Sequence, residues 1–92
     1  MDVKIRNKGL RRFYLTGDER GIPEVLSNRL ARRLDDLATA NHPRDLDLPG
    51  YRLHALKGKL VGYWSIRVSG NWRLIFRINN GEAVDVDLID YH

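Results

Sequence analysis

The 92-residue sequence contains no cysteine and only three prolines. Without cysteine it can form neither disulfide bonds nor a thiolate metal site. It also lacks any run of 18 apolar residues, the length that a membrane-spanning helix needs. The N-terminus turns polar too early for a secretory signal, since Asp2, Lys4 and Arg6 interrupt it. We therefore expect one small domain over residues 1–92 that works in the cytoplasm and has no contact with a membrane.

Acidic side chains are missing from one long segment. Residues 51–77 contain six basic and no acidic side chains, whereas residues 78–92 contain four acidic and no basic ones. Aromatic residues are interleaved with the basic ones, at Tyr51, Tyr63, Trp64, Trp72 and Phe76. A cationic surface with interleaved aromatic rings suits a phosphate backbone whose bases can stack. A solvated basic face without a ligand is the alternative, and composition leaves both open.

Helical spacing of apolar residues dominates the first half of the chain. It predicts two amphipathic helices, over Lys8–Thr16 and roughly over 23–40. Gly17 is a typical stop for the first helix, and Pro23 suits the first turn of the second. The second helix has the clearer period, because its leucines recur at three- and four-residue spacing on one face. A short strand at Val3–Arg6 is expected before both helices.

After a loop at 41–50, the apolar period changes to two, which is typical of strands. The expected strands are Tyr51–Lys57, Tyr63–Ser69, Trp72–Ile78 and Ala83–Asp90. In the last of them, Val84, Val86 and Leu88 are expected to face the core. The order β-α-α-β-β-β-β predicts an α+β fold, with two N-terminal helices packed on one face of a mainly antiparallel sheet.

The opposite face of this sheet is expected to be concave, polar and open to a ligand. Three arginines alternate onto it, at Arg67, Arg73 and Arg77. Asp85 and Asp87 share one face of the neighbouring strand and are expected to pair with these arginines. A magnesium site built with Asp90 is the alternative, but Asp90 falls on the other parity of the strand. We therefore expect no metal.

Histidine and acidic residues near this basic face indicate proton-transfer chemistry. RNA supplies its own nucleophile, the ribose 2′-hydroxyl, so an RNase needs a base, an acid and cations but no covalent side chain. Histidine titrates near neutrality and can serve as base or acid, and arginine can stabilise the charge on the phosphate. The candidate groups are His54, Arg73, Asp90, Tyr91 and His92, with Lys57 as a second cation. Taken singly, His54 is more often structural and His92 more often a frayed terminal residue.

Several strings of the sequence resemble the HigB killer-protein family of the RelE/ParE superfamily. They are Leu53-His54-Ala55-Leu56-Lys57-Gly58, Gly62-Tyr63-Trp64-Ser65-Ile66-Arg67-Val68, Asn71-Trp72-Arg73 and Asp90-Tyr91-His92, together with Lys8-Gly9-Leu10 and Gly21-Ile22-Pro23. The resemblance covers the whole chain, and a joint match of these motifs is highly specific. One departure is Ala55, where relatives often carry proline.

The resemblance implies a RelE-like α+β fold and the toxin of a type II toxin–antitoxin system. It implies a metal-independent endoribonuclease without a cofactor, which cuts translated mRNA in the A site of the 70S ribosome. The implied partner is a HigA-type helix-turn-helix antitoxin, through which operator DNA would be contacted only indirectly. Within the family, positions matching His54, Asp90, Tyr91 and His92 are associated with cleavage and Arg73 with the phosphate. RNA-backbone contacts are implied for Lys57, Lys59, Arg67 and Asn71.

Two other functions stay open at this point. One is a ParE-like toxin that binds DNA gyrase without nuclease activity, and the other is a non-catalytic RNA- or DNA-binding module. A pure binding protein does not require the combination of His54 with the C-terminal Asp90-Tyr91-His92 string. The presence of that combination favours the endoribonuclease.

Overall fold

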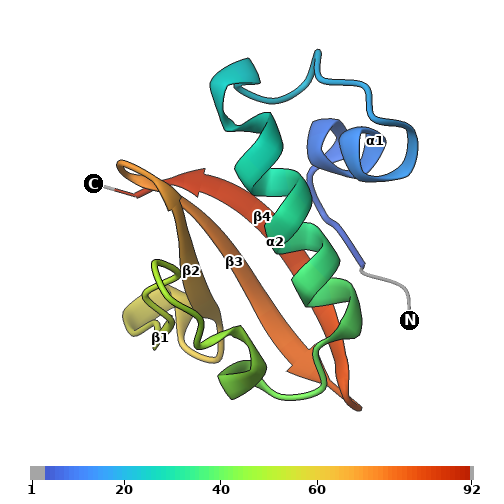
Figure 1. Cartoon of the computed structure of the whole chain (residues 1–92). Coiled ribbons are helices and arrows are strands. Elements are labelled where there is room, and N and C mark those ends of the chain that lie inside the picture. The colour runs from blue at the N-terminus through green and yellow to red at the C-terminus, as the bar shows by residue number, and fades with distance from the viewer. Residues whose placement is uncertain (1–3, 92) are drawn as a thin grey trace.

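The computed structural model describes residues 4–91 and has two helices on one face of a four-stranded antiparallel sheet (Figure 1). The elements are α1 Lys8–Thr16, α2 Ser27–Thr39, β1 His54–Ala55, β2 Trp64–Ser69, β3 Trp72–Asn79 and β4 Glu82–Asp90. The strands lie in the order β1-β2-β3-β4. Figure 1 shows α2 crossing in front of the sheet, with α1 beside its N-terminal half. The predicted α+β fold is confirmed.

Helix α1 has the predicted bounds, and two glycines fix its position. The Asn7 side chain accepts the Leu10 backbone N–H, and Gly17 closes the helix in a left-handed conformation with φ 79°. A Cβ atom on Gly9 would lie 2.4 Å from the carbonyl oxygen of Gly21, far inside van der Waals contact. Since only glycine fits there, the connection after α1 can pack directly against the helix.

Helix α2 supplies the core with the predicted row of leucines. Leu30, Leu34 and Leu37 are almost completely buried. They pack against the apolar side chains of the sheet, which include Ile66, Val68, Leu74, Phe76 and Val86. The α-helix begins at Ser27 rather than near Pro23, because Glu24–Leu26 form a separate 3₁₀ turn. Short 3₁₀ turns also lie at Pro43–Leu46 and Gly58–Leu60.

The strand expected over Tyr51–Lys57 is much shorter in the structure. Only His54–Ala55 pair with β2, opposite Ser65 and Trp64. Arg52 has a φ of 50° and Gly58 a φ of 66°, so extended backbone ends on both sides of this pair. Beyond β1, the edge of β2 therefore has no complete strand beside it.

The segment before α1 runs parallel to β4. Ile5 forms an isolated parallel bridge with Val86, and the Lys4 carbonyl accepts the Val86 N–H. This is the remnant of the strand expected at Val3–Arg6, of which Val3 lies outside the described residues. The sheet is therefore mainly antiparallel, as predicted.

A bulge in β4 changes which residues face the core. The register with β3 shifts between Ile75 and Arg77, and Asp85 has a φ of 52°. Ala83 is 2% exposed and belongs to the core, whereas Val84 lies opposite Arg77. The expectation that Val84 faces the core is therefore wrong. Val86 is buried as predicted. The bulge inserts one residue between Ala83 and Val86, so both side chains can face the core.

The face of the sheet opposite α2 is only partly polar. A second apolar cluster covers part of it, formed by Leu56, Tyr63 and Ile75 with Leu60 and Ile89 packed around them. The segment from β1 to Tyr63 thus lies over the sheet and shields it. The polar face expected there is therefore open only in part, around Arg67 and Arg73. This face is called the outer face below.

Candidate active site

Two arginines face each other at the centre of the open part of the outer face. Arg67 on β2 lies directly opposite Arg73 on β3. Like charges in directly opposed positions of a sheet are destabilising. In addition, Nε and Nη1 of Arg73 are buried and have no hydrogen-bond partner among the described residues. Because unpaired buried donors cost free energy, this pair is suited to an anion that would satisfy them.

Arg77, the third arginine of the outer face, is engaged within the protein. Its guanidinium lies 4.4 Å from the centre of the Tyr63 ring, and Nε lies 3.8 Å from Oδ2 of Asp85. The predicted pairing of Asp85 with an arginine is therefore confirmed. Asp87, for which the same was expected, lies opposite Ile75 and accepts the Leu88 N–H at 2.8 Å. The expected arginine pair of Asp87 is not formed within residues 4–91.

His54 is exposed on β1, and its ring has one defined contact. Nδ1 lies 3.2 Å from the carbonyl oxygen of Arg52. Since a carbonyl oxygen can only accept, Nδ1 carries the proton in this contact, which leaves the lone pair of a neutral ring on Nε2. The left-handed backbone at Arg52 aims this carbonyl. Residue type does not reveal such a conformation for arginine, so sequence analysis did not single out Arg52.

Residues that lie opposite one another across the strands form a row on the outer face. The register places His54 and Arg73 in neighbouring rows of this kind. His54 lies opposite Ser65, which lies opposite Ile75, two residues along β3 from Arg73. Two strand spacings across and two residues along put the Cα atoms of His54 and Arg73 about 12 Å apart. A long arginine side chain and an imidazole can therefore approach one phosphate group from two sides. Ser65 between them is 1% exposed, and its hydroxyl has no partner among the described residues.

The C-terminal end of β4 continues this arrangement beyond Arg73. The Tyr91 N–H donates to the Asn71 carbonyl at 2.7 Å, so Tyr91 falls in the next row of the outer face. Asp90 lies opposite Trp72 and thus on the other parity of the strand. His92 lies outside the described residues. The outer face therefore carries His54 and Tyr91 on either side of Arg73, and the register does not bring Asp90 onto it.

The residues expected to contact the RNA backbone surround this row. Lys57 and Lys59 are exposed directly after β1, with Lys59 in the Gly58–Leu60 turn. Asn71 is exposed in the turn between β2 and β3. Together with the half-buried Arg67, these side chains border the outer face on two sides. The structure assigns them no ligand, so their RNA contacts stay a prediction.

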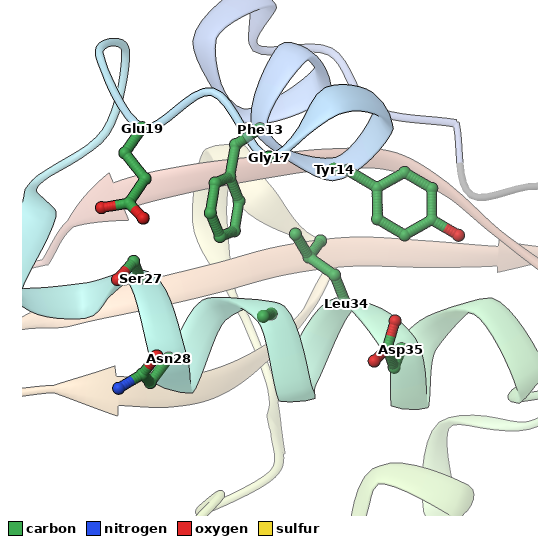
Figure 2. A pocket seen from close by; sticks show the side chains of 9 residues that line it. Phe13, Tyr14, Gly17, Glu19, Ser27, Asn28, Leu34 and Asp35 are labelled. Atoms are coloured by element: carbon green, nitrogen blue, oxygen red, sulfur yellow. The ribbon is translucent and has the colours of Figure 1, made fainter.

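A groove between α1 and α2 contains none of the predicted site residues. Figure 2 shows Phe13 and Leu34 inside it, with Glu19 and Asp35 toward its two ends. The lining has no lysine, arginine or histidine. Acidic side chains at a groove repel phosphate, so the outer face is the better candidate for a polyanion.

Residues 4–91 hold no group of three histidine, cysteine or acidic side chains arranged around a possible metal ion. Within the same residues, neither helix is long and apolar enough to cross a bilayer.

Comparison with known proteins connects this geometry to a family. Residues 3–92 match a family model described as the RelE-like toxin of type II toxin–antitoxin system HigB. Endoribonuclease HigB of Proteus vulgaris is 39% identical over 92 residues, which is the whole of both chains. Toxin HigB-1 of Vibrio cholerae serotype O1 is 38% identical over 91 residues, 96% of this chain and 95% of that one. The resemblance seen in the sequence motifs is confirmed, and the chain belongs to the HigB-like family of RelE-like toxins of type II toxin–antitoxin systems.

Proposed function

We propose that this toxin is a metal-independent endoribonuclease that cleaves translated mRNA in the A site of the ribosome. The observation that carries the proposal is the opposed pair Arg67 and Arg73, in the row next to an exposed histidine, with two Arg73 N–H groups that have no partner among residues 4–91. The printed name of the Proteus vulgaris relative, an endoribonuclease over its whole length, supports the same activity. The activity is proposed for one domain that spans residues 1–92.

The reaction needs no nucleophile from the protein. The ribose 2′-oxygen attacks the adjacent phosphorus, the bond from phosphorus to the 5′-oxygen breaks, and a cyclic phosphate and a 5′-hydroxyl result. A base takes the 2′-proton, an acid gives a proton to the 5′-oxygen, and a cation stabilises the pentavalent phosphate. Positioned proton transfer contributes roughly 10²–10⁴ in rate and a preorganised donor roughly 10²–10³.

The positions on the outer face suggest a role for each group. His54 is assigned as the base, because the Arg52 carbonyl holds the proton on Nδ1 and leaves Nε2 to accept one. Arg73 is assigned as the cation on the phosphate. The acid is assigned to the C-terminal string of Asp90, Tyr91 and His92. Attacking and leaving oxygens of an in-line displacement lie on opposite sides of phosphorus, which suits a base and an acid on either side of Arg73.

Membership of the family supports a proposal for the partners and the location of the protein. A type II toxin has an antitoxin partner. We propose a HigA-type antitoxin with a helix-turn-helix domain, which would hold operator DNA without direct contact from the toxin. The ribosome and mRNA are proposed as the second set of partners, with RNA-backbone contacts from Lys57, Lys59, Arg67 and Asn71. This assigns the protein to the cytoplasm.

Primer extension on a translated message tests the activity in cells. Induction of the chain should produce new 5′ ends in phase with codons, and blocking translation of that message should remove them. Growth arrest without new RNA ends would contradict the proposal and favour the gyrase-binding toxin. Binding of RNA without arrest or cleavage would favour a non-catalytic module.

A further inference from the structure

A second cationic groove lies between α2 and the segment that precedes β1. It is lined by Asn28, Arg29, Arg32, Arg33, Pro49 and Tyr51. The three arginines come from one side of α2, at spacings that bring their side chains together. The groove contains none of the residues to which cleavage or RNA contacts were assigned above.

Two of these arginines are held in place by the edge of β2. Nε of Arg33 donates to the Arg67 carbonyl at 2.7 Å, and Nη1 of Arg29 lies 3.4 Å from the Val68 carbonyl, at the limit of a hydrogen bond. Arg33 is 8% exposed and stacks over the Tyr51 ring at 4.3 Å. These contacts satisfy the carbonyls of a strand edge that β1 leaves uncovered. They also fix the guanidinium groups in position before any ligand arrives.

The described lining of the groove carries three arginines and no acidic side chain. Burial lowers the pKa of Arg33, whereas Tyr51 and Asp36 act to raise it, and the charges of Arg29 and Arg32 act to lower it. Asp36 is the acidic side chain that faces Arg33, and it accepts a hydrogen bond from the Tyr51 hydroxyl. Three guanidinium groups thus face one carboxylate that is already engaged. An anion in the groove would relieve this repulsion.

The groove and the outer face adjoin the same residue of β2. The Arg67 side chain belongs to the outer face opposite Arg73, while the Arg67 carbonyl contacts Arg33 beside the groove. Figure 1 shows that β2 lies at the side of the sheet from which β1 and the preceding segment extend. The Arg67 N–H also donates to the Tyr51 carbonyl at 2.6 Å, so an extended chain that leaves the Arg67–Arg73 row would cross Tyr51 to reach Arg29 and Arg32.

We propose that this groove binds the phosphodiester backbone of the substrate RNA strand, at nucleotides that flank the cleaved position. The inference rests on the proposed endoribonuclease function and extends it to a subsite for the flank. Arg33 forms the buried floor of the subsite, and the exposed Arg29 and Arg32 contact phosphates. A ligand that is one continuous strand explains why the groove and the outer face meet at Arg67.

Binding of RNA of two lengths to the full chain tests the subsite. The probes are a trinucleotide and a dodecanucleotide with 2′-O-methyl riboses, which cannot be cleaved because the nucleophile is blocked. Arg32→Gln should weaken binding of the long RNA by about tenfold or more, as expected for one lost charge-assisted contact. It should reduce the slope of log affinity against log salt by about 0.7 for each lost phosphate contact on a single strand. The affinity for the trinucleotide should change less than about twofold. That is the range expected when the exposed charge that is removed makes no contact with the ligand.

Arg12→Gln is the matched control, since Arg12 is also an exposed arginine of a helix and its loss removes the same charge. It should leave both affinities within about twofold, because its charge acts on RNA only through screened solvent. Equal losses for Arg32→Gln and Arg12→Gln would overturn the proposal and indicate general charge attraction. Equal losses on the short and long RNA would also overturn it.

The same proteins separate this inference from the proposed function. If unmodified RNA on ribosomes is cleaved and Arg32→Gln shows no length-dependent loss, the flank subsite is wrong and the nuclease stands. If the length-dependent loss is present and no cleavage occurs, the subsite stands as an RNA site and the nuclease is wrong.

Discussion

The ring of His54 lies against the carbonyl of Arg52, with 3.2 Å between Nδ1 and the oxygen. Arg52 itself has a φ of 50°, a left-handed conformation that non-glycine residues rarely adopt. A backbone feature thereby selects which imidazole nitrogen receives a proton. The unusual backbone just before β1 therefore bears on the assignment of His54 as the base.

The protonation of His54 can be observed directly. In the neutral ring, long-range nitrogen–proton NMR correlations should show the proton on Nδ1. Arg52→Gly should preserve this pattern because glycine tolerates a positive φ, whereas Arg52→Val should weaken it because a β-branched residue does not. A neutral His54 with its proton on Nε2 in the wild-type chain would contradict the assignment.

Removing the His54 imidazole should slow cleavage without unfolding the protein. His54→Ala should lower the single-turnover rate on ribosome-bound mRNA by roughly 10²–10⁴, the usual contribution of a positioned base. The free energy of unfolding should change by less than about 0.5 kcal/mol, because the side chain is exposed. A stable variant that cleaves at the wild-type rate would remove His54 from the mechanism.

Arg73 should contribute to activity at a cost to stability. Arg73→Met should reduce cleavage by roughly 10²–10³ through loss of the phosphate donor. It should leave the free energy of unfolding unchanged or raise it by up to about 1–3 kcal/mol, because the buried N–H groups of Arg73 have no partner. Urea unfolding and single-turnover cleavage measure the two effects.

Arg77→Met is the matched control on the same strand and face. Nε of Arg77 also has no hydrogen-bond partner among the described residues, but Arg77 stacks on Tyr63 and lies 3.8 Å from Asp85, so its loss should reduce stability by up to about 1 kcal/mol. It should affect cleavage less than Arg73→Met does. Similar stability losses in both variants would show that Arg73 is a structural residue.

The layers of this fold could be predicted from the sequence, but several local features could not. The leucine period of α2 and the alternation in β2 and β3 correctly predicted which faces meet in the core. The bulge at Asp85 was not predictable, because one inserted residue reverses the alternation without a glycine or proline to mark it. Val84 was consequently assigned to the wrong face.

The candidate site was predictable in residue type but not in geometry. The sequence motifs identified His54, Arg73 and Tyr91, which the register places in successive rows of the outer face. The apolar cluster over that face was missed because Leu56 and Ile75 are far apart in the chain and were interpreted separately. Burial of Arg33 was also missed, since it depends on carbonyls of a strand more than thirty residues later.

The close approach of Gly9 and Gly21 should make both positions intolerant of a side chain. Alanine inside a helix normally stabilises it relative to glycine by about 0.5–1 kcal/mol. Gly9→Ala should instead destabilise the protein by about 1–3 kcal/mol, because its Cβ would meet the Gly21 carbonyl at 2.4 Å. The exposed neighbour Lys8→Ala is the control for urea unfolding, and an equally stable Gly9→Ala would contradict the packing of α1.

Tyr51 should make stability depend on pH in the alkaline range. Burial, and then the hydrogen bond to Asp36, raise the pKa of Tyr51 from 10.0 to about 12. The folded protein therefore keeps this proton at a pH where the unfolded chain releases it. The stabilisation is complete below pH 10 and is lost as the pH rises to about 12, by about 2–3 kcal/mol. Urea unfolding between these values should show a smaller loss for Tyr51→Phe, and identical profiles would contradict the shift.

Deleting Tyr91 and His92 should abolish growth arrest while the fold survives. Tyr91 is 43% exposed, and its N–H makes one backbone bond, to Asn71. The deletion should therefore remove few contacts with the core. It removes two of the three residues to which the acid was assigned. Growth after induction, with urea unfolding of the purified truncation, measures both. Undiminished toxicity of a stable truncation would exclude the C-terminal string from the site.

The central claim is that the RNA supplies the nucleophile and the outer face supplies the proton transfers and the charge. Purified ribosomes programmed with an mRNA that carries one 2′-deoxy nucleotide at the cleaved position test it most directly. The account predicts cleavage of the all-ribose message to a cyclic phosphate and a 5′-hydroxyl, and none at the 2′-deoxy position. Cleavage that continues at the 2′-deoxy nucleotide would contradict it.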